Sequence, residues 1–393
     1  MGRQRDGEDP RVGWVVPSDA SETGGGDATS AWLWGMTPRE RLRRSLVRAG
    51  CEAVCTTASP PSAVADAVVL AVRDGFVLDE RLLLALSERP NTVLVHPAHG
   101  PLAVCAPGTR VGAIRPHLCE TADDASEDAA SSEAWHERTP DALVPAYQPK
   151  LRKRAEPFVF PAEPEHRAAI EADTFAASYK GSSDLVTLWV WPRPARAVTH
   201  WCAERGVQPN TVTLWSWVGA IVAFWLLWNG HFVAGLLVGW WMTFLDTVDG
   251  KLARVTLTSS RLGDVLDHGL DLVHPPFWWW AFGIGLGTGH EAATAIIVGG
   301  YVLGRVLEGA FLASFGFECH SWRPADALFR TITARRNPNL LLLSVGTAVG
   351  RPDLGFTLVA AWTLCSLAFH SVRLLQAFVA RRDGTPVVAW AAG

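Results

Sequence analysis

Four aspartates form two pairs whose spacing could build a metal site. Asp246 and Asp249 are three residues apart and Asp267 and Asp271 are four apart, so within helices each pair lies on one face. A carboxylate near the centre of a bilayer costs roughly 2.5 kcal/mol or more and normally has a function. Four anions at one point would repel unless divalent cations neutralised them. An all-carboxylate site selects hard cations, so we expect Mg²⁺ or Mn²⁺.

The residues between these aspartates fit a bound phosphate. Gly250 and Gly263 leave room for a bulky ligand to approach the backbone, and Arg254 offers a guanidinium fork suited to phosphate. Pro275 should bend its helix just beyond Asp271. Alternatively, the aspartates could be helix-end charges near the lipid headgroups. That would explain one or two of them, but it poorly explains four aspartates at helical spacing with glycines and an arginine between them.

The order of these residues resembles a known family signature. The sequence matches the pattern D-x2-D-G-x2-A-R-x8-G-x3-D-x3-D at every defined position. The match begins with Asp246-Thr-Val-Asp249-Gly250-Lys-Leu-Ala253-Arg254. Gly263 follows after eight residues, Asp267 after three and Asp271 after three more. This pattern is the signature of the CDP-alcohol phosphotransferases. Gln208-Pro209-Asn210-Thr211-Val212-Thr213 also resembles the stretch that opens the family's first span. The resemblance covers about residues 178–382.

The resemblance implies a six-span membrane enzyme, usually dimeric, with its active site open to the cytosol. An acceptor hydroxyl would attack the β-phosphorus of a CDP-linked alcohol and release CMP, in phospholipid or inositol-phosphodiester synthesis. The donor stays open between CDP-diacylglycerol and a soluble CDP-alcohol such as CDP-inositol. The resemblance implies two Mg²⁺ or Mn²⁺ ions, held by Asp246, Asp249, Asp267 and Asp271. Asp267 and Asp271 would be catalytic. Asp271 would act either as a ligand shared by the two ions or as the general base. The residues implied to hold the CDP part are Gly250, Ala253, Arg254 and Gly263.

Cationic residues further along the chain are candidates for binding an acceptor. Arg305 lies inside an apolar stretch, and Arg330, Arg335 and Arg336 follow it. In this family such residues would suit a phosphorylated acceptor, for example inositol phosphate or glycerol phosphate. Arg305 could instead form a structural pair with Glu308, three residues on, and the other three could simply mark an inward-facing loop.

The apolar segments needed to position these residues predict a membrane domain. Residues 212–245 contain no Asp, Glu, Lys or Arg; one such helix would be about 51 Å long, beyond a ~30 Å hydrocarbon layer. We split the stretch at Asn229-Gly230-His231, a turn-forming cluster. Six spans are expected, at about 212–228, 232–250, 262–286, 292–315, 338–350 and 355–376. Basic residues concentrate in alternate loops, which predicts a cytoplasmic membrane protein with both termini and the active site on the cytosolic side.

The N-terminal part predicts a small cytosolic α/β domain. A helix is expected at 38–49 and another near Asp79, with short β-branched runs at 51–56, 67–72, 92–95 and 102–106 in a mostly parallel sheet. The expected organisation is a disordered tail (1–30), the α/β domain (31–118), a linker and approach segment (119–177), the membrane domain (178–382) and a tail (383–393).

This domain resembles a reduced sugar-nucleotide transferase, such as precedes the phosphotransferase in the bifunctional inositol-phosphate cytidylyltransferase and di-myo-inositol-phosphate-phosphate synthase group. The segment VVLAVRDGFVLDERLLLAL resembles the strand and turn that carry the family's metal-binding aspartate, which would be Asp74. The glycine-rich L-A-A-G-x-G-x-R loop is absent, and Gly24-Gly25-Gly26 lies in a polar segment that we do not expect to follow a strand. We therefore expect an inactive domain, and a generic α/β domain is the alternative.

Composition and pattern also bear on other functions. The net charge of −4 gives no basis for nucleic-acid binding. Membrane prenyltransferases also use paired aspartates but do not need the interleaved glycines, alanine and arginine. A cation transporter would carry polar residues across several spans, whereas the outer halves here are rich in Trp, Leu and Gly.

The scattered cysteines predict reduced thiols, neither a disulfide framework nor a metal site. Small-xxx-small pairs, Gly283/Gly287 and Gly300/Gly304, suggest a homodimer seam.

Overall fold

The computed structural model of this chain describes residues 10–17, 32–62, 64–119, 135–149, 151–259 and 261–392. The side chains of residues 261, 262, 264, 266–268 and 270 lie outside this description. The described residues divide into two compact units. The α/β unit takes those of Met1–Ala146, Ala155–Ala177 and Val255–Thr258, and the helical unit takes those of Tyr147–Arg154, Ser178–Arg254 and Ser259–Gly393.

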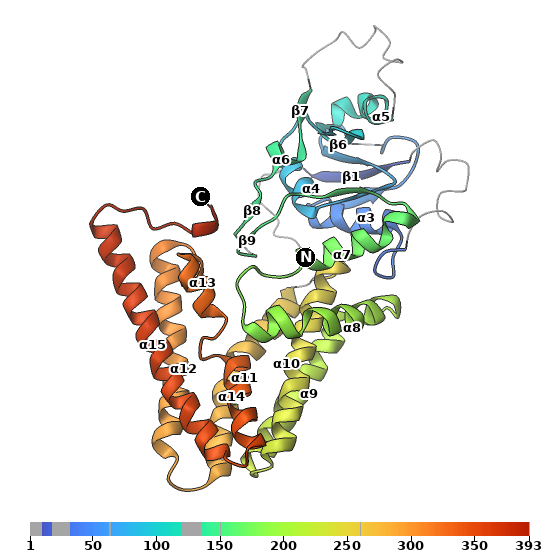
Figure 1. Cartoon of the computed structure of the whole chain (residues 1–393). Helices are drawn as coiled ribbons and strands as arrows, with labels where there is room; N and C mark the ends of the chain where they lie inside the picture. The colour runs from blue at the N-terminus through green and yellow to red at the C-terminus, as the bar shows by residue number, and fades with distance from the viewer. Residues whose placement is uncertain are drawn as a thin grey trace. The chain divides into compact units, whose positions relative to one another are not determined.

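A six-stranded mixed sheet forms the centre of the α/β unit, in the order β2-β1-β3-β6-β5-β7 (Figure 1). Its strands are β1 Arg11–Val16, β2 Ala53–Cys55, β3 Val68–Arg73, β5 Thr92–His96, β6 Gly100–Pro107 and β7 His136–Arg138. The strand β1 pairs in parallel with β2 and β3, and β5 with β7, whereas β6 is antiparallel to both β3 and β5. The prediction of a mostly parallel sheet misses this reversal, because β5 and β6 are joined by a turn too short for a crossover helix.

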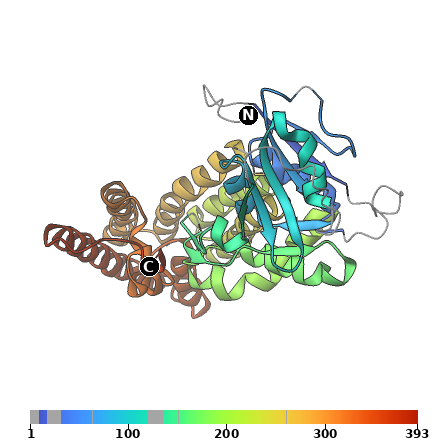
Figure 2. The same cartoon turned by 90° about the horizontal axis from the view of Figure 1, so that it is seen from above.

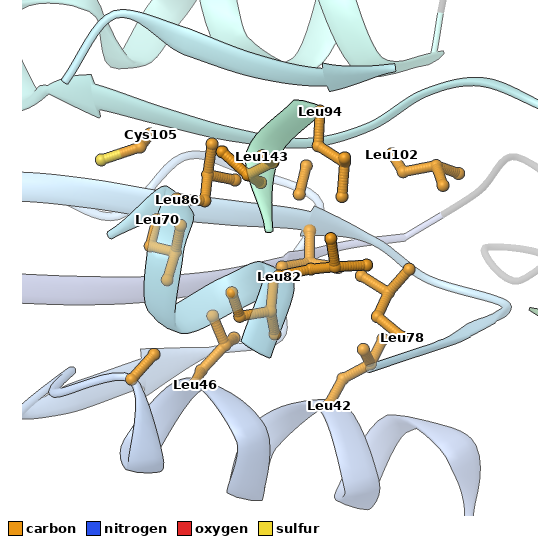
Figure 3. Close-up of a cluster of buried hydrophobic side chains, with 14 of the residues drawn as sticks. Leu42, Leu46, Leu70, Leu78, Leu82, Leu86, Leu94, Leu102, Cys105 and Leu143 are labelled. Atoms are coloured by element: carbon orange, nitrogen blue, oxygen red, sulfur yellow. The ribbon is translucent and has the colours of Figure 1, made fainter. Parts of the chain in front are cut away.

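Helices cover both faces of this sheet. They are α3 Pro38–Arg48, α4 Glu80–Leu86, α5 Val111–Cys119 and α6 Pro140–Leu143. The helix α7 Arg167–Ala177 packs on Trp34 through Thr174 and Phe175, and β4 Phe76–Leu78 pairs with β10 Val159–Pro161 in a small ribbon. Because successive strand residues point to opposite faces, Leu70 and Leu94 pack with the leucines of α3 and α4 (Figure 3), while Val69 and Val93 pack with α5. The unit is a three-layer α/β fold.

Local sequence signals position the first two helices of this unit as predicted. Thr37 caps α3 by accepting the N–H of Glu40, and Pro38 occupies the first turn, where its missing N–H is harmless. Asp79 caps α4 by accepting the N–H of Arg81. The predicted helices at 38–49 and near Asp79 are confirmed.

The predicted tail and linker are wrong where they contain strands of the sheet. The strand β1 lies within residues 1–30, yet its last four residues are buried, and β7 lies within residues 119–177. The exposed edge strand β7 has no apolar alternation to indicate it, and β1 is a short apolar run in polar surroundings. The remaining residues of the predicted tail, 1–9 and 18–30, lie outside the described residues, as do 120–134.

The helical unit is a bundle of long apolar helices. Its elements are β8 Tyr147–Gln148, β9 Lys153–Arg154, α8 Pro192–Glu204, α9 Pro209–Trp228, α10 Phe232–Val255, α11 Arg261–Leu286, α12 Glu291–Phe315, α13 Pro324–Arg330, α14 Arg336–Ala348 and α15 Pro352–Arg382. Among the described residues, four helices are long and apolar enough to cross a membrane, namely α9, α10, α12 and α15. These lie at four of the predicted spans, and the chain is a membrane protein. The predicted turn at Asn229–His231 is confirmed between α9 and α10.

Indole hydrogen bonds and close backbone approach hold the bundle together. The Trp278 Nε1–H on α11 donates to the Ala220 carbonyl on α9 (2.8 Å), and the Trp240 Nε1–H on α10 donates to Ser344 Oγ on α14 (2.9 Å). Helices α12 and α15 run side by side (Figures 1 and 2). These contacts satisfy polar groups that lipid could not satisfy.

Two of the four glycines expected at a homodimer seam pack helices within one chain instead. A Cβ on Gly300 would lie 2.4 Å from Thr363 Cγ2 on α15, and a Cβ on Gly283 would lie 2.1 Å from Thr294 Oγ1 on α12. A Cβ on Gly304 would lie 3.8 Å from Leu367 Cδ2, an ordinary contact, and one on Gly287 would meet nothing within 4 Å. The placement of the seam is therefore wrong at Gly283 and Gly300 and stays a prediction at Gly287 and Gly304.

We expect Gly300→Ala to destabilise the helical unit, because its methyl group has no room against Thr363. Overpacking of this kind costs about 1–3 kcal/mol, so thermal unfolding in detergent should occur at a lower temperature than in the unmodified protein. The matched control is Gly299→Ala, whose Cβ would meet nothing within 4 Å and which should gain up to ~1 kcal/mol of helix propensity. Equal unfolding temperatures for the two variants would contradict this packing.

Candidate active site

The signature aspartates lie on adjacent elements of the helical unit. Helix α10 carries Asp246 and Asp249 toward its C-terminal end, and α11 carries Asp267 and Asp271 in its first half. The side chains of Asp246 and Asp249 are buried, and Asp271 lines a cavity. The side chain of Asp267 lies outside the described residues, so three of the four predicted ligands can be placed.

One guanidinium shows that the two helices aim carboxylates at a common point. Arg336, the first residue of α14, donates from Nη2 to Asp246 Oδ2 (2.6 Å) and from Nη1 to Asp271 Oδ1 (2.7 Å). The guanidinium of Arg336 thus lies between one carboxylate of α10 and one of α11, and the convergence of all four aspartates on a divalent metal stays a prediction. Both terminal nitrogens of Arg336 donate to carboxylates of the protein, so they are already engaged. Binding of the acceptor by Arg336 therefore stays a prediction.

A hydroxyl on the neighbouring helix orients Asp249. Thr213 of α9 lies with Oγ1 2.6 Å from Asp249 Oδ2 and 3.2 Å from the carbonyl of Pro209. Thr213 closes the short segment that resembles the opening of the family's first span, and its position gives that resemblance a physical meaning. Ligand carboxylates in metal sites are typically held by such outer hydrogen bonds.

A second hydroxyl supports the backbone at Asp271. Pro275 and Pro276 lie inside α11 and cannot donate to the carbonyls of Asp271 and Leu272, four residues earlier. Both carbonyls instead lie near the Tyr301 hydroxyl of α12, at 3.0 and 3.2 Å. The helix therefore continues through the prolines to Leu286, and a residue that sequence reasoning overlooked satisfies the freed backbone groups.

The residues predicted to hold the CDP part lie beside these carboxylates. Gly250 and Arg254 line the cavity, while Ala253 and Gly263 are half-buried on α10 and α11. Arg254 Nη1 donates to the carbonyl of Ser178 (3.2 Å), and so does Nζ of the buried Lys251 (3.2 Å). The end of α10 thereby fixes the chain that follows Ser178.

That chain supplies cavity residues that the signature does not include. Gly181 donates its N–H to the Leu151 carbonyl (2.7 Å), and a Cβ there would lie 2.3 Å from the Arg152 carbonyl oxygen. This close approach brings Arg152, Lys180 and Asp184 to the cavity wall. Gly181 is the one sequence feature that could have indicated this crossing. A glycine is informative here only once the segments around Gly181 and Arg152 are known to meet.

Asp184 is held as a carboxylate by its neighbours. It accepts hydrogen bonds from the backbone N–H of Val186 (3.1 Å) and Thr187 (3.0 Å) and from Asn337 Nδ2 (2.9 Å). Burial opposes ionisation, but Arg330 and the hydrogen bonds from Asn337 and Thr187 outweigh it and lower the pKa of the carboxyl below its ordinary value.

The other predicted acceptor residues differ in their pairing. Arg305 Nη2 donates to Glu308 Oε1 (2.7 Å), as the structural alternative predicts, and Arg335 also pairs with Glu308. In the described chain, Nε and Nη1 of Arg330 are buried without a hydrogen-bond partner. Burial, with Arg335 close by, lowers the pKa of this guanidinium to about 9. Unsatisfied buried donors on a cation make Arg330 the best placed of the four to receive an anion.

These residues enclose one cavity of about 580 Å³ in the helical unit, with a smaller one of about 100 Å³ next to it. Among the described residues, eight basic side chains and five carboxylates line the larger cavity. The excess of positive charge suits an anionic substrate, and the carboxylates of α10 and α11 form an all-oxygen donor set on one side. The residues present therefore fit a Mg²⁺ or Mn²⁺ centre beside an anion site.

In the α/β unit, Asp74 follows β3 next to β1, at the carboxyl ends of two parallel strands. Open α/β sheets bind ligands at such edges. Here Asp74 pairs with Arg39, whose Nε and Nη2 lie 2.9 and 2.6 Å from Oδ2. The strand β1 ends at Val16, eight residues before Gly24, so the expectation about Gly24-Gly25-Gly26 stays a prediction. The three glycines themselves lie outside the described residues.

Residues 207–333 match the family described as CDP-alcohol phosphatidyltransferase. A phosphatidylinositol phosphate synthase of Mycobacteroides abscessus is 34% identical over 89 residues, 21% of this chain and 40% of the relative. One of Streptomyces avermitilis is 41% identical over 71 residues, 18% of this chain and 29% of the relative. Choline/ethanolaminephosphotransferase 1 of Arabidopsis thaliana is 51% identical over 53 residues, 14% of this chain and 13% of the relative. The chain spans less than half the length of each of these relatives.

Among solved structures, phosphatidylinositol phosphate synthase of Mycobacterium tuberculosis with CDP-DAG bound is 19% identical, with a TM-score of 0.38. The match covers 46% of this chain and 94% of that one. The same synthase in complex with manganese and citrate matches with a TM-score of 0.38 at 18% identity, over 46% of this chain and 88% of that chain.

We expect Thr213→Val to weaken divalent-metal binding, because it keeps the shape of the side chain but removes the hydroxyl that orients Asp249. Losing an outer partner of this kind lowers metal affinity about 10- to 100-fold. Titration of the detergent-purified protein with Mn²⁺, followed by electron paramagnetic resonance, measures the change. Thr211→Val is the matched control, since Thr211 is exposed on the same helix. Equal Mn²⁺ affinities in the two variants would rule out an orienting role for Thr213.

Proposed function

We propose that this chain transfers a phosphoalcohol group from a CDP-alcohol to an acceptor alcohol and releases CMP, since residues 207–333 match the CDP-alcohol phosphatidyltransferase family. One observation carries the proposal beyond the family match. Asp246 and Asp271, from two helices, converge on a single cation at the wall of a cavity large enough for a nucleotide substrate. The complete family signature supplies the residues at that convergence.

We propose Asp246, Asp249, Asp267 and Asp271 as the ligands of one or two Mg²⁺ or Mn²⁺ ions. When bound, these ions would polarise the diphosphate and stabilise the charge that develops on CMP. Arg336 occupies the space between Asp246 and Asp271 in the described arrangement, so metal loading would require its guanidinium to move. Gly250, Ala253, Arg254 and Gly263 would hold the CDP part at the same end of α10 and α11.

The reaction needs a base for the acceptor hydroxyl. We propose Asp271, with Asp267 as the alternative, because Asp271 lines the cavity and its backbone is held by Tyr301. The base takes the hydroxyl proton, the hydroxyl oxygen forms a bond to the β-phosphorus, and the bond from that phosphorus to the bridging oxygen of CMP breaks. A phosphodiester and CMP are the products.

We propose a phosphorylated acceptor, such as inositol phosphate or glycerol phosphate. The cationic excess of the cavity and the unsatisfied donors of Arg330 support an anionic acceptor over an uncharged one. The phosphatidylinositol phosphate synthases among the relatives fit this chemistry. The donor stays open between CDP-diacylglycerol and a soluble CDP-alcohol.

The wider organisation follows the same proposal. We propose that α11 and α14 complete six spans with the four long apolar helices, in a membrane domain of about residues 178–382. Both termini and the active site would face the cytosol of a cell membrane, because basic residues concentrate on that side. The preceding α/β domain would be an inactive relative of nucleotidyltransferases, and the homodimer implied by the family stays a prediction.

Activity should depend on a divalent metal and on Asp267. In membranes that contain the full-length protein, CMP release from a CDP-alcohol should require Mg²⁺ or Mn²⁺ and stop with chelator. Asp267→Asn removes the ligand charge and should lower the rate on the order of 10²-fold or more. Asp264→Asn, outside the signature on the same helix, is the control. Near-normal turnover in Asp267→Asn would reject the assignment of the metal site.

Arg330→Gln tests the acceptor. If Arg330 binds the acceptor phosphate, the variant should raise KM for that acceptor ~10- to 100-fold, the range expected for losing hydrogen bonds to a charged group, and change KM for the CDP donor little. Arg330→Lys should recover part of the affinity. Arg323→Gln, an exposed arginine of the same connection, is the matched control. An unchanged acceptor KM in Arg330→Gln would place the acceptor elsewhere.

A further inference from the structure

A cluster of metal-ligating side chains lies apart from the aspartates of the proposed active site. Cys319 and His320 lie on a short 3-10 turn, Cys319–Ser321, that follows α12, and His370 lies on α15. One ligand atom from each residue can be chosen so that all three atoms lie within 4.8 Å of one another. The exposed fractions of the three residues are 8%, 1% and 6%. No other thiol-containing cluster of this kind occurs among the described residues.

The hydrogen bonding of the two histidines points to a missing partner. His370 Nε2 is buried and, within the described chain, has no hydrogen-bond partner. Leaving such a group unsatisfied costs about 1–3 kcal/mol. His320 Nε2 lies 3.2 Å from Glu308 Oε1, so Nδ1 would be the ligand atom of this ring. Histidine ligands of metals usually donate their second ring N–H to a carboxylate in this way.

Packing alone does not explain the cluster. The rings of His320 and His370 lie edge to face with centroids 5.2 Å apart, and His370 also meets the ring of Phe329. Such contacts account for the apolar surfaces of the imidazoles. They supply no acceptor or donor to His370 Nε2, and they do not require a thiol at Cys319.

We propose that Cys319, His320 and His370 form a zinc site that is distinct from the aspartate centre. One thiolate and two imidazoles are a borderline-soft donor set that suits Zn²⁺, whereas carboxylates alone suit Mg²⁺ or Mn²⁺. Three protein ligands leave one tetrahedral position, which water can fill because Cys319 and His320 also line the larger cavity. Glu308 is the carboxylate that orients His320. The sequence does not indicate this site, because His370 lies 50 residues beyond His320 and the three ligands follow no zinc-motif spacing.

The zinc would tie the turn after α12 to α15. It would also fix Glu308, which pairs with Arg305 and Arg335 at the cavity wall.

The test uses the full-length protein purified in detergent, with metal content measured after dialysis and Co²⁺ used as a spectroscopic substitute for zinc. We expect one tightly held zinc per chain and, with Co²⁺, a thiolate-to-cobalt charge-transfer absorption. Cys319→Ser and His370→Gln should lose both. Two variants should keep both: Cys365→Ser, which removes an exposed thiol from the same helix as His370, and Asp246→Asn, which alters the aspartate centre.

Several results would overturn the site. An unmodified protein that gives no thiolate-to-cobalt absorption has no such centre, and this measurement does not depend on whether a variant folds. Absorption that persists in Cys319→Ser but disappears in Cys365→Ser would assign the thiolate to the other cysteine. Zinc that is lost with Asp246→Asn and retained with Cys319→Ser would place the ion at the aspartates.

Discussion

Charge compensation of carboxylates inside an apolar helix bundle is the constraint that organises this protein. Asp246 and Asp271 share Arg336, and Glu308 is paired with Arg305 and Arg335. For the largely buried carboxylates Asp246 and Glu308, removing one partner of the pair would cost about 3–5 kcal/mol, because the remaining charge stays uncompensated. The short helix α14 begins with Arg336, so its position against α10 and α11 is coupled to the same charges that form the proposed active site.

Two hydroxyl groups fix the positions of carboxylates in this charge cluster. Thr213 holds the side chain of Asp249, and Tyr301 satisfies the carbonyls that Pro275 and Pro276 free next to Asp271. Each hydroxyl comes from a helix that carries none of the signature aspartates. The carboxylates are thus positioned by α9 and α12 as well as by α10 and α11, which is the kind of rigid outer support that a metal centre needs.

The cavity combines three kinds of polar surface at close range. Its lining includes carboxylate oxygens, the unsatisfied guanidinium donors of Arg330, and the thiol and imidazole of Cys319 and His320. These groups prefer different partners: hard cations, anions and a borderline metal ion respectively. Glu308 links the imidazole to the basic side chains of the cavity, since it accepts hydrogen bonds from Arg305 and Arg335 and lies 3.2 Å from Nε2 of His320.

Features that depend on neighbours along the chain could be predicted from the sequence. The aspartate pairs on helix faces, the caps Thr37 and Asp79, and the turn at Asn229–His231 follow from spacings of a few residues, which local geometry controls. The folded chain was needed to show which distant segments meet. It placed β1 within the sheet, Gly300 against Thr363 of the same chain, Arg152 beside Lys180, and Cys319 near His370. These contacts join residues that are far apart along the chain. Hydrophobic periodicity reports only on neighbouring residues, so no local pattern could indicate such contacts.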